Sequence, residues 1–180
     1  MVALGEMGDK TQLLALVLAA RYHAPRPIVA GIFVATLANH ALAGALGAWL
    51  TQAVGPQWLR WGLGLSFIAM ALWMLVPDKH DGTHAGEHSR LGVFGITTVA
   101  FFLTEIGDKT QIATVMLAAR YEALAAVVMG TTLGMLIANV PAVYLGDKVL
   151  KFVPIAWVHR IAALVFAAIG IAVLAGVGSA

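Results

Sequence analysis

The sequence predicts an all-α membrane protein with six transmembrane helices, arranged as two inverted-topology repeats of three helices each. Three observations lead to this prediction. Of the 180 residues, 61% are hydrophobic and only 11% are charged, with a mean hydropathy of +0.88, so polar residues are too few to cover a soluble domain. The apolar residues form long stretches without the alternation of a membrane β-barrel. A seven-residue motif also occurs twice, and its copies begin at Glu6 and Glu105.

The six apolar stretches are each long enough to cross a membrane as a helix. A hydrocarbon core about 30 Å thick takes roughly 20 helical residues. Proline marks several of the boundaries: Pro25 follows the first stretch, Pro56 precedes the third, Pro77 ends it and Pro154 precedes the sixth. The expected helices cover, approximately, residues 1–21, 27–51, 58–76, 91–119, 123–146 and 155–176.

One long polar stretch, residues 77–90, divides the chain into a first three-helix repeat (1–76) and a second (91–180). Similarity between the halves extends beyond the motif: Gly31 corresponds to Gly130, and Asn39 to Asn139. Because each repeat holds an odd number of spans, the second is expected to insert upside down relative to the first. In transporters built this way, the substrate site lies between the repeats near the membrane midplane.

Basic residues predict the orientation in the membrane. The connections on one side are richer in lysine and arginine than those on the other, where only Arg60 and Arg120 are found. Cytoplasmic connections carry the excess of these residues, so residues 77–90 are expected in the cytoplasm and both termini outside. We expect a multi-pass protein of a bacterial inner (plasma) membrane. The basic residues do not form one patch, so nucleic acid is not an expected partner. The richer side carries Arg21, Arg26, Lys79, Arg90, Lys148 and Lys151.

The repeated motif places ionisable residues inside apolar stretches, where they are costly and usually functional. Glu6 and Asp9 are three residues apart and are expected to share a helix face, as are Glu105 and Asp108. A glycine lies between the carboxylates of each copy and permits either close backbone approach or local unwinding. The motif residues are Glu6, Gly8, Asp9, Lys10, Thr11 and Gln12 in the first copy, and Glu105, Gly107, Asp108, Lys109, Thr110 and Gln111 in the second.

These side chains offer oxygen ligands, and the chain has no cysteine. Such a set suits hard cations, meaning calcium, manganese or magnesium, rather than copper or zinc. Four carboxylates and two lysines carry a net charge of −2 when all are ionised, which one divalent cation would neutralise. Without the cation, crowded carboxylates in a low dielectric should hold protons. Cation entry would then displace protons, which favours a proton-coupled antiporter over a passive pore.

Other polar residues in the expected spans have two readings each. Asn39 and Asn139 lie near the middle of the second and fifth helices, where they could bind a cation or join two helices by a hydrogen bond. His40 has no counterpart in the second repeat, and packing and proton acceptance are both open to it.

Pro141 is expected to kink the fifth helix. An intrahelical ion pair of Glu6 with Lys10 would not by itself explain the rest of the motif.

The polar stretch also contains three histidines that could collect metal on the cytoplasmic side. Glycines at positions 82 and 86 interrupt the helical spacing that would bring them together, so a solvated loop is favoured. These histidines are His80, His84 and His88.

The repeated E-x-G-D-K-T-Q motif in a six-span inverted repeat resembles the cation/proton exchangers of the second calcium:cation antiporter family, which includes a Golgi manganese and calcium transporter and bacterial manganese exporters. The resemblance covers nearly the whole chain. It implies export of Mn²⁺ or Ca²⁺ from the cytoplasm in exchange for protons, with no resident cofactor and no enzymatic activity. It also implies which residues bind the cation or lie close by, with Lys10 and Lys109 at the motif's basic position: Glu6, Asp9, Glu105, Asp108, Thr11, Gln12, Thr110 and Gln111.

Two alternatives use the same intramembrane carboxylates: a passive cation channel and an exporter of another small solute. An intramembrane aspartyl protease is disfavoured, because a lysine follows each motif aspartate and no Tyr-Asp partner motif is present. The two copies also differ in position. Only five residues precede Glu6, and they would span about 8 Å as helix, too little to reach the membrane midplane. Either the true start lies upstream, or the first helix is short and neighbours cover its end; if Met1 is the start, the site is expected to be more open to the outside than the repeat suggests.

Overall fold

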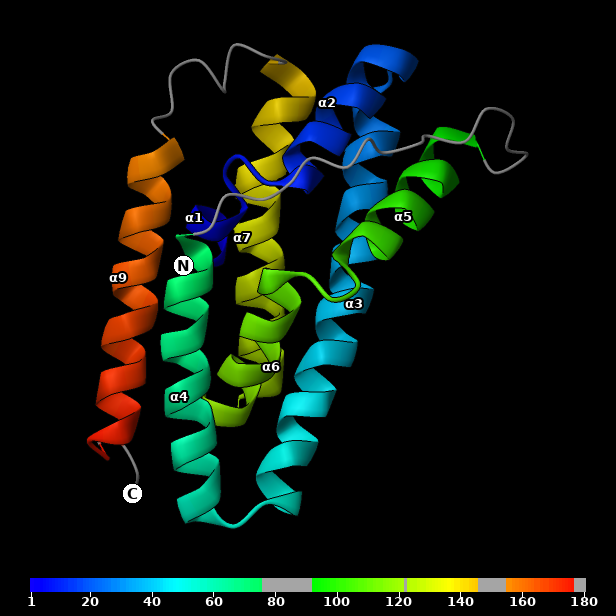
Figure 1. The fold of residues 1–180 in the computed structure, drawn as a ribbon. Coiled ribbons are helices and arrows are strands. Elements are labelled where there is room, and N and C mark those ends of the chain that lie inside the picture. The colour runs from blue at the N-terminus through cyan, green and yellow to red at the C-terminus, as the bar shows by residue number, and fades with distance from the viewer. Residues whose placement is uncertain (76–91, 122, 146–154, 177–180) are drawn as a thin grey trace.

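The structure is a computed structural model that describes residues 1–75, 92–121, 123–145 and 155–176. Over these residues the chain is all-helical, as predicted, and forms eight helices (Figure 1). The predicted cytoplasmic loop with His80, His84 and His88 lies outside the described residues. The helices are α1 (Val2–Glu6), α2 (Lys10–Tyr22), α3 (Pro25–Ala53), α4 (Pro56–Met74), α5 (Gly92–Glu105), α6 (Lys109–Tyr121), α7 (Leu124–Leu145) and α9 (Ile155–Leu174).

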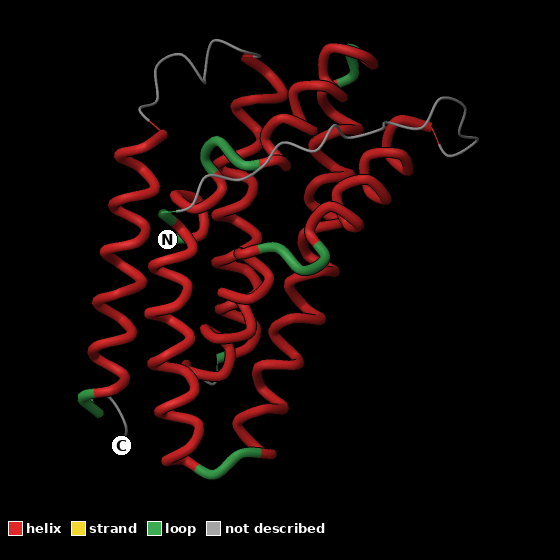
Figure 2. Tube along the Cα trace, viewed as in Figure 1, coloured by secondary structure: helices red, strands yellow, loops and turns green. Residues whose placement is uncertain are grey.

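Two of the six expected helices are broken. The first is divided into α1 and α2, and the fourth into α5 and α6. Figure 2 shows the two interruptions as short loop segments within the bundle. By contrast, α7 continues through Pro141. Prolines instead begin α3 and α4, because a proline at the first helical position gives up an N–H that the helix could not have used.

The helices α4 and α9 pack along each other at one side of the bundle (Figure 1). Glycines allow this close approach: a Cβ atom on Gly170 would lie 3.0 Å from the carbonyl oxygen of Gly64. The rings of Phe67 and Phe166 pack in the same seam, with centroids 6.2 Å apart. Close van der Waals packing of this kind is what holds apolar helices together inside a bilayer.

Each long unbroken helix packs on the broken pair from the other half of the sequence. The helix α3 contacts α5 and α6, and α7 contacts α1 and α2. Small residues permit both contacts, since a Cβ on Gly31 would lie 2.7 Å from that of Thr97, and one on Gly134 would lie 3.0 Å from that of Val2. This crosswise packing brings the two interruptions, and the motifs they contain, into the interior.

The outer surface is rich in exposed apolar side chains, including Leu42, Leu103, Ile137 and Leu164, which are 62–71% exposed. Large apolar surfaces of this kind are typical of faces that contact lipid or a partner. Among the described helices, α3 and α7 are long and apolar enough to cross a membrane, while α5 and the segment Arg160–Leu174 are apolar but shorter. Exposed tryptophans lie near helix ends, as interfacial residues do: Trp49, Trp58, Trp61 and Trp157.

Candidate metal centre

The motif glycines produce the two helix interruptions. The φ angle is +82° at Gly8 and +78° at Gly107, a left-handed conformation that residues with a Cβ adopt only at a cost. The helices α1 and α5 end at the motif glutamates, and α2 and α6 begin just after the aspartates. The expectation that the glutamate and aspartate of each motif share one continuous helix face is therefore wrong, and local unwinding is the reading of the glycines that the structure supports.

The motif glutamines close the interruptions. The Gly8 backbone N–H donates to Gln12 Oε1 at 2.8 Å, and the Gly107 N–H donates to Gln111 Oε1 at 2.7 Å. Unwinding leaves these N–H groups without a helical partner, and the glutamine amide oxygens supply the missing acceptor. The glutamines were predicted only as neighbours of the cation. Their role at the breaks was missed because it exists only once the helix is interrupted.

Gly107 allows a clean test of the interruption. A Cβ at this position would meet nothing within 4 Å, so Gly107→Ala adds only the strain of a left-handed residue, about 1–2 kcal/mol. We expect lower thermal stability and weaker cation transport. Gly107→Asn should be milder, because asparagine tolerates this conformation better than alanine. Equal effects of the two substitutions on the melting temperature would contradict the backbone explanation.

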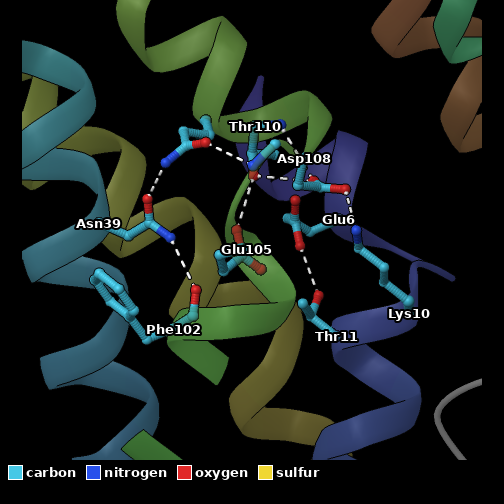
Figure 3. Close-up of polar contacts among 10 residues, drawn as sticks. Glu6, Lys10, Thr11, Asn39, Phe102, Glu105, Asp108 and Thr110 are labelled. Carbon is cyan, nitrogen blue, oxygen red and sulfur yellow. Dashed lines mark hydrogen bonds and ion pairs between the residues drawn. The ribbon is translucent and has the colours of Figure 1, made fainter. Parts of the chain in front are cut away.

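Carboxylates from both motifs converge at the interruptions. Oxygens of Glu6, Asp9 and Asp108 lie within 4.8 Å of one another, and all three residues are buried. We refer to these residues as the carboxylate cluster. Glu105 is fully buried too, but it is not a member of this cluster of described residues. In Figure 3, Glu105 lies on the side of Asn39 and Phe102, while Glu6 and Asp108 lie near Lys10.

Threonine hydroxyls hold the two glutamates. Thr11 Oγ1 donates to Glu6 Oε2 at 2.8 Å, and Thr110 Oγ1 lies 3.2 Å from Glu105 Oε2 and 3.3 Å from Asp108 Oδ2 (Figure 3). In each glutamate the other oxygen, Oε1, is buried without a hydrogen-bond partner among the described residues. Buried polar atoms without partners are rare in proteins, so these oxygens are available to a ligand.

Asp108 also caps α6, because Oδ2 accepts a hydrogen bond of 3.3 Å from the Thr110 backbone N–H. Such a cap satisfies one of the free donors in the first turn of a helix. The positive end of a helix dipole further favours an ionised carboxylate there. Asp9 occupies the equivalent position before α2 but makes no side-chain cap there. The two aspartates thus share a place at a helix start, and only Asp108 bonds to the backbone of its helix.

The motif lysines do not have the same surroundings. Lys10 Nζ lies 3.0 Å from Asp108 Oδ1, so its ion pair joins the two motifs. The reading of Glu6 and Lys10 as an intrahelical ion pair is wrong, because α1 ends before Lys10 and the lysine turns to the other copy. Lys109 is almost fully buried, and its Nζ lies 5.7 Å from the centre of the Trp73 ring of α4.

The two asparagines are both buried but differ in their bonds. Asn39 accepts a hydrogen bond from Gln111 Nε2 and donates to the Phe102 carbonyl at 3.3 Å. It therefore joins helices, one of the two roles predicted for it. Asn139 donates instead within its own helix, to the Met135 carbonyl at 3.1 Å and its sulfur at 3.0 Å. His40 is buried beside Asn39, and neither ring nitrogen has a hydrogen-bond partner among the described residues.

Comparison with known proteins identifies the family. The model of the family described as divalent cation/proton antiporter GDT1 matches residues 1–82 and 93–179. A protein of Vibrio cholerae serotype O1 named "Putative manganese exporter" is 52% identical over 166 residues, which cover 92% of this chain and 82% of the relative. No solved structure matches the chain. The family consists of transporters, so the prediction that the chain is not an enzyme is confirmed. With nearly its whole length matched, this chain belongs to the GDT1 family of divalent cation/proton antiporters.

Proposed function

We propose that this chain exports a divalent cation, Mn²⁺ and/or Ca²⁺, from the cytoplasm in exchange for protons. The observation that carries the proposal is the carboxylate cluster, in which oxygens from both motifs lie within 4.8 Å of one another in the interior. Oxygen ligands at this spacing suit a hard divalent cation, whose metal–oxygen distances are roughly 2.0–2.6 Å. The relative from Vibrio cholerae, named for manganese, supports Mn²⁺ as one cargo.

The motif residues divide into ligands and positioning residues. Glu6, Asp9 and Asp108 bind the cation in the arrangement seen here, and Glu105 contributes its unpartnered oxygen during the transport cycle. The remaining motif side chains hold the site in shape: Thr11 and Thr110 bond to the glutamates, Gln12 and Gln111 close the helix breaks, and Lys10 pairs with Asp108. Lys109, Asn39 and Asn139 complete the surroundings.

Coupling to protons follows from the crowding of the cluster. Three ionised carboxylates in a small buried volume repel one another, and burial further disfavours the charged forms. Either a divalent cation or protons can relieve this repulsion, so the two compete for the same oxygens. Each cation that leaves is therefore replaced by protons, which is the chemical basis of exchange.

The proposed topology has six spans in two inverted repeats: residues 1–76, the cytoplasmic loop 77–90, and residues 91–180. In this assignment α1 with α2, and α5 with α6, each form one discontinuous span. The crosswise packing of α3 on α5 and α6, and of α7 on α1 and α2, supports the assignment, and interrupted spans are a feature of inverted-repeat transporters. The positive-inside pattern puts both termini outside a bacterial inner membrane.

The orientation can be tested directly because the natural chain lacks cysteine. A single cysteine at Gly82 should react with a membrane-impermeant maleimide only in inside-out vesicles. A cysteine at Gln57, in the expected connection on the opposite side, should react only in right-side-out vesicles. Labelling of both sites from the same side would contradict the proposed topology.

Flux measurements on purified protein test the exchange itself. In proteoliposomes containing a pH-sensitive dye, we expect Mn²⁺ or Ca²⁺ movement to be accompanied by proton movement in the opposite direction. An imposed pH gradient should accelerate the flux several-fold, and Mg²⁺ should be compared in parallel. Asp81→Asn, which removes a carboxylate from the polar stretch, is the control and should leave the flux unchanged. Cation flux that neither moves protons nor responds to the gradient would favour a passive channel.

A further inference from the structure

In Gln12 and Gln111, the amide oxygens make the same hydrogen bond, whereas the amide nitrogens bond to different kinds of acceptor. Both glutamine Oε1 atoms accept from the glycine N–H at the helix break. This contact fixes the amide groups, so each Nε2 group points away from its own motif and must find an acceptor on the facing helix. Those helices are α3 for Gln111 and α7 for Gln12.

In the second motif the acceptor is a side chain. Gln111 Nε2 donates to Asn39 Oδ1, and Asn39 Nδ2 donates to the Phe102 carbonyl (Figure 3). The chain of hydrogen bonds thus runs from α6 through α3 to α5. Asn39 holds both halves of this discontinuous helix against α3.

In the first motif, the corresponding hydrogen bond between the glutamine and the asparagine is not made. Gln12 Nε2 donates to the Ala138 backbone carbonyl at 2.9 Å, one residue before Asn139. Asn139 turns back to Met135, and its Oδ1 is buried without a hydrogen-bond partner among the described residues. The acceptor that Gln12 would need for a copy of the Asn39 contact is therefore present, buried and unused.

The carboxylates are asymmetric in the same sense. At the second helix break, which the engaged Asn39 faces, Glu105 lies outside the carboxylate cluster; at the first break, which Asn139 faces, Glu6 is inside it. The state of each asparagine thus matches the position of the glutamate in the helix break that it faces.

We propose that Asn39 and Asn139 form an exchange latch, in which the Asn39–Gln111 and Asn139–Gln12 hydrogen bonds are made alternately in the two states of the transport cycle. This inference rests on the proposed exchange function. In the arrangement seen here, the Asn39–Gln111 hydrogen bond is made and the Asn139–Gln12 hydrogen bond is not. In the opposite state, Asn139 accepts from Gln12, Asn39 releases Gln111, and Glu105 replaces Glu6 in the cluster.

The chain is suited to such an exchange at Asn139. The two acceptors available to Gln12, Ala138 and Asn139, are neighbours in sequence, so the change requires only a small shift of α7 and a new side-chain rotamer. Pro141 lies within the next turn and has no N–H to donate to the Ile137 carbonyl, which weakens the helical ladder at this point. An interrupted ladder lets a helix adjust locally at low cost.

Spin labels can measure the populations of the two states. Cysteines replacing Val34 and Val99 report on α3 against α5, and cysteines replacing Val17 and Ile137 report on α2 against α7; all four sites are exposed. One or two buried hydrogen bonds change a two-state ratio by roughly 5- to 30-fold. Asn39→Ala should lower the population of the arrangement seen here by about that factor, and Asn139→Ala should raise it. The double variant should return to within about twofold of the wild type.

Shifts in the same direction for both single variants, or no shift in either, would overturn the latch, because a merely structural asparagine gives no reciprocal effect. Asn39→Ser and Asn139→Ser, which are smaller perturbations, should shift the ratio with the same signs and guard against misfolding. Proton-coupled Mn²⁺ flux is measured on the same wild-type preparation. Flux with unmoved label distances refutes only the latch, whereas reciprocal distances without flux refute the proposed exchange.

Discussion

Asp108→Asn should lower cation affinity and proton-coupled transport by about 100-fold or more. Asp108 belongs to the carboxylate cluster, so under the proposed function its neutralisation removes both a ligand and one of the charges that attract the cation. Loss of residues that merely orient a metal ligand already costs roughly 10- to 100-fold in affinity, and loss of a ligand should cost at least as much. Binding of Mn²⁺ to purified protein and flux into proteoliposomes would measure the two effects separately.

The ion pair of Asp108 with Lys10 makes a control necessary. Lys10 is one-third exposed, and partly exposed ion pairs stabilise proteins by only about 0–1 kcal/mol. If Asp108 served only as the partner of this lysine, Lys10→Met would impair transport as much as Asp108→Asn. We expect instead that Lys10→Met retains most of the binding, and that adding it to Asp108→Asn does not restore transport.

The convergence of carboxylates from both motifs could be predicted from sequence because the motif occurs twice. Two copies of four oxygen-bearing side chains, placed in apolar stretches, predict that Glu6, Asp9 and Asp108 belong to one cation site. The helical class and approximate limits of the apolar segments follow from composition and proline positions. Orientation and repeat inversion are predictions that the labelling experiments address.

The helix interruptions were harder to predict, because sequence allows a glycine either to pack closely or to unwind. The two choices give different roles to Gln12 and Gln111. Only in an unwound segment does the glycine N–H need a side-chain acceptor. The pairing of Lys10 with Asp108 depends on tertiary packing between distant segments, which a single sequence does not specify.

Sequence symmetry also overstated the likeness of the two halves. Gly31 and Gly130 correspond in the sequence, yet their surroundings differ. A Cβ on Gly31 would lie 2.7 Å from Thr97 Cβ, while one on Gly130 would meet nothing within 4 Å. The asparagines Asn39 and Asn139 diverge in the same way. The proposed latch requires the two repeats to be asymmetric in any one state, and these differences are consistent with that requirement.

Gly47→Ala should be the most damaging of the glycine substitutions in α3. A Cβ at this position would overlap the Val115 carbonyl oxygen and lie 2.9 Å from the Ala118 Cβ. The opposing atoms are backbone or directly attached to it, so no side-chain rotation can relieve the overlap, and α3 must move away from α6. Overpacking of this kind costs about 3 kcal/mol. We expect a clear drop in melting temperature and a loss of transport.

Gly130→Ala is the matched control, because Gly130 is also helical but lies exposed with open space around it. Alanine there should stabilise α7 by up to about 1 kcal/mol through its higher helix propensity. The difference between the two substitutions isolates the contact of α3 with α6 from any general intolerance of alanine. Because α6 begins at the second helix break, separating it from α3 also moves Gln111 away from Asn39 and displaces Asp108. A Gly47→Ala protein that melts like the wild type would show that α3 does not pack closely on α6.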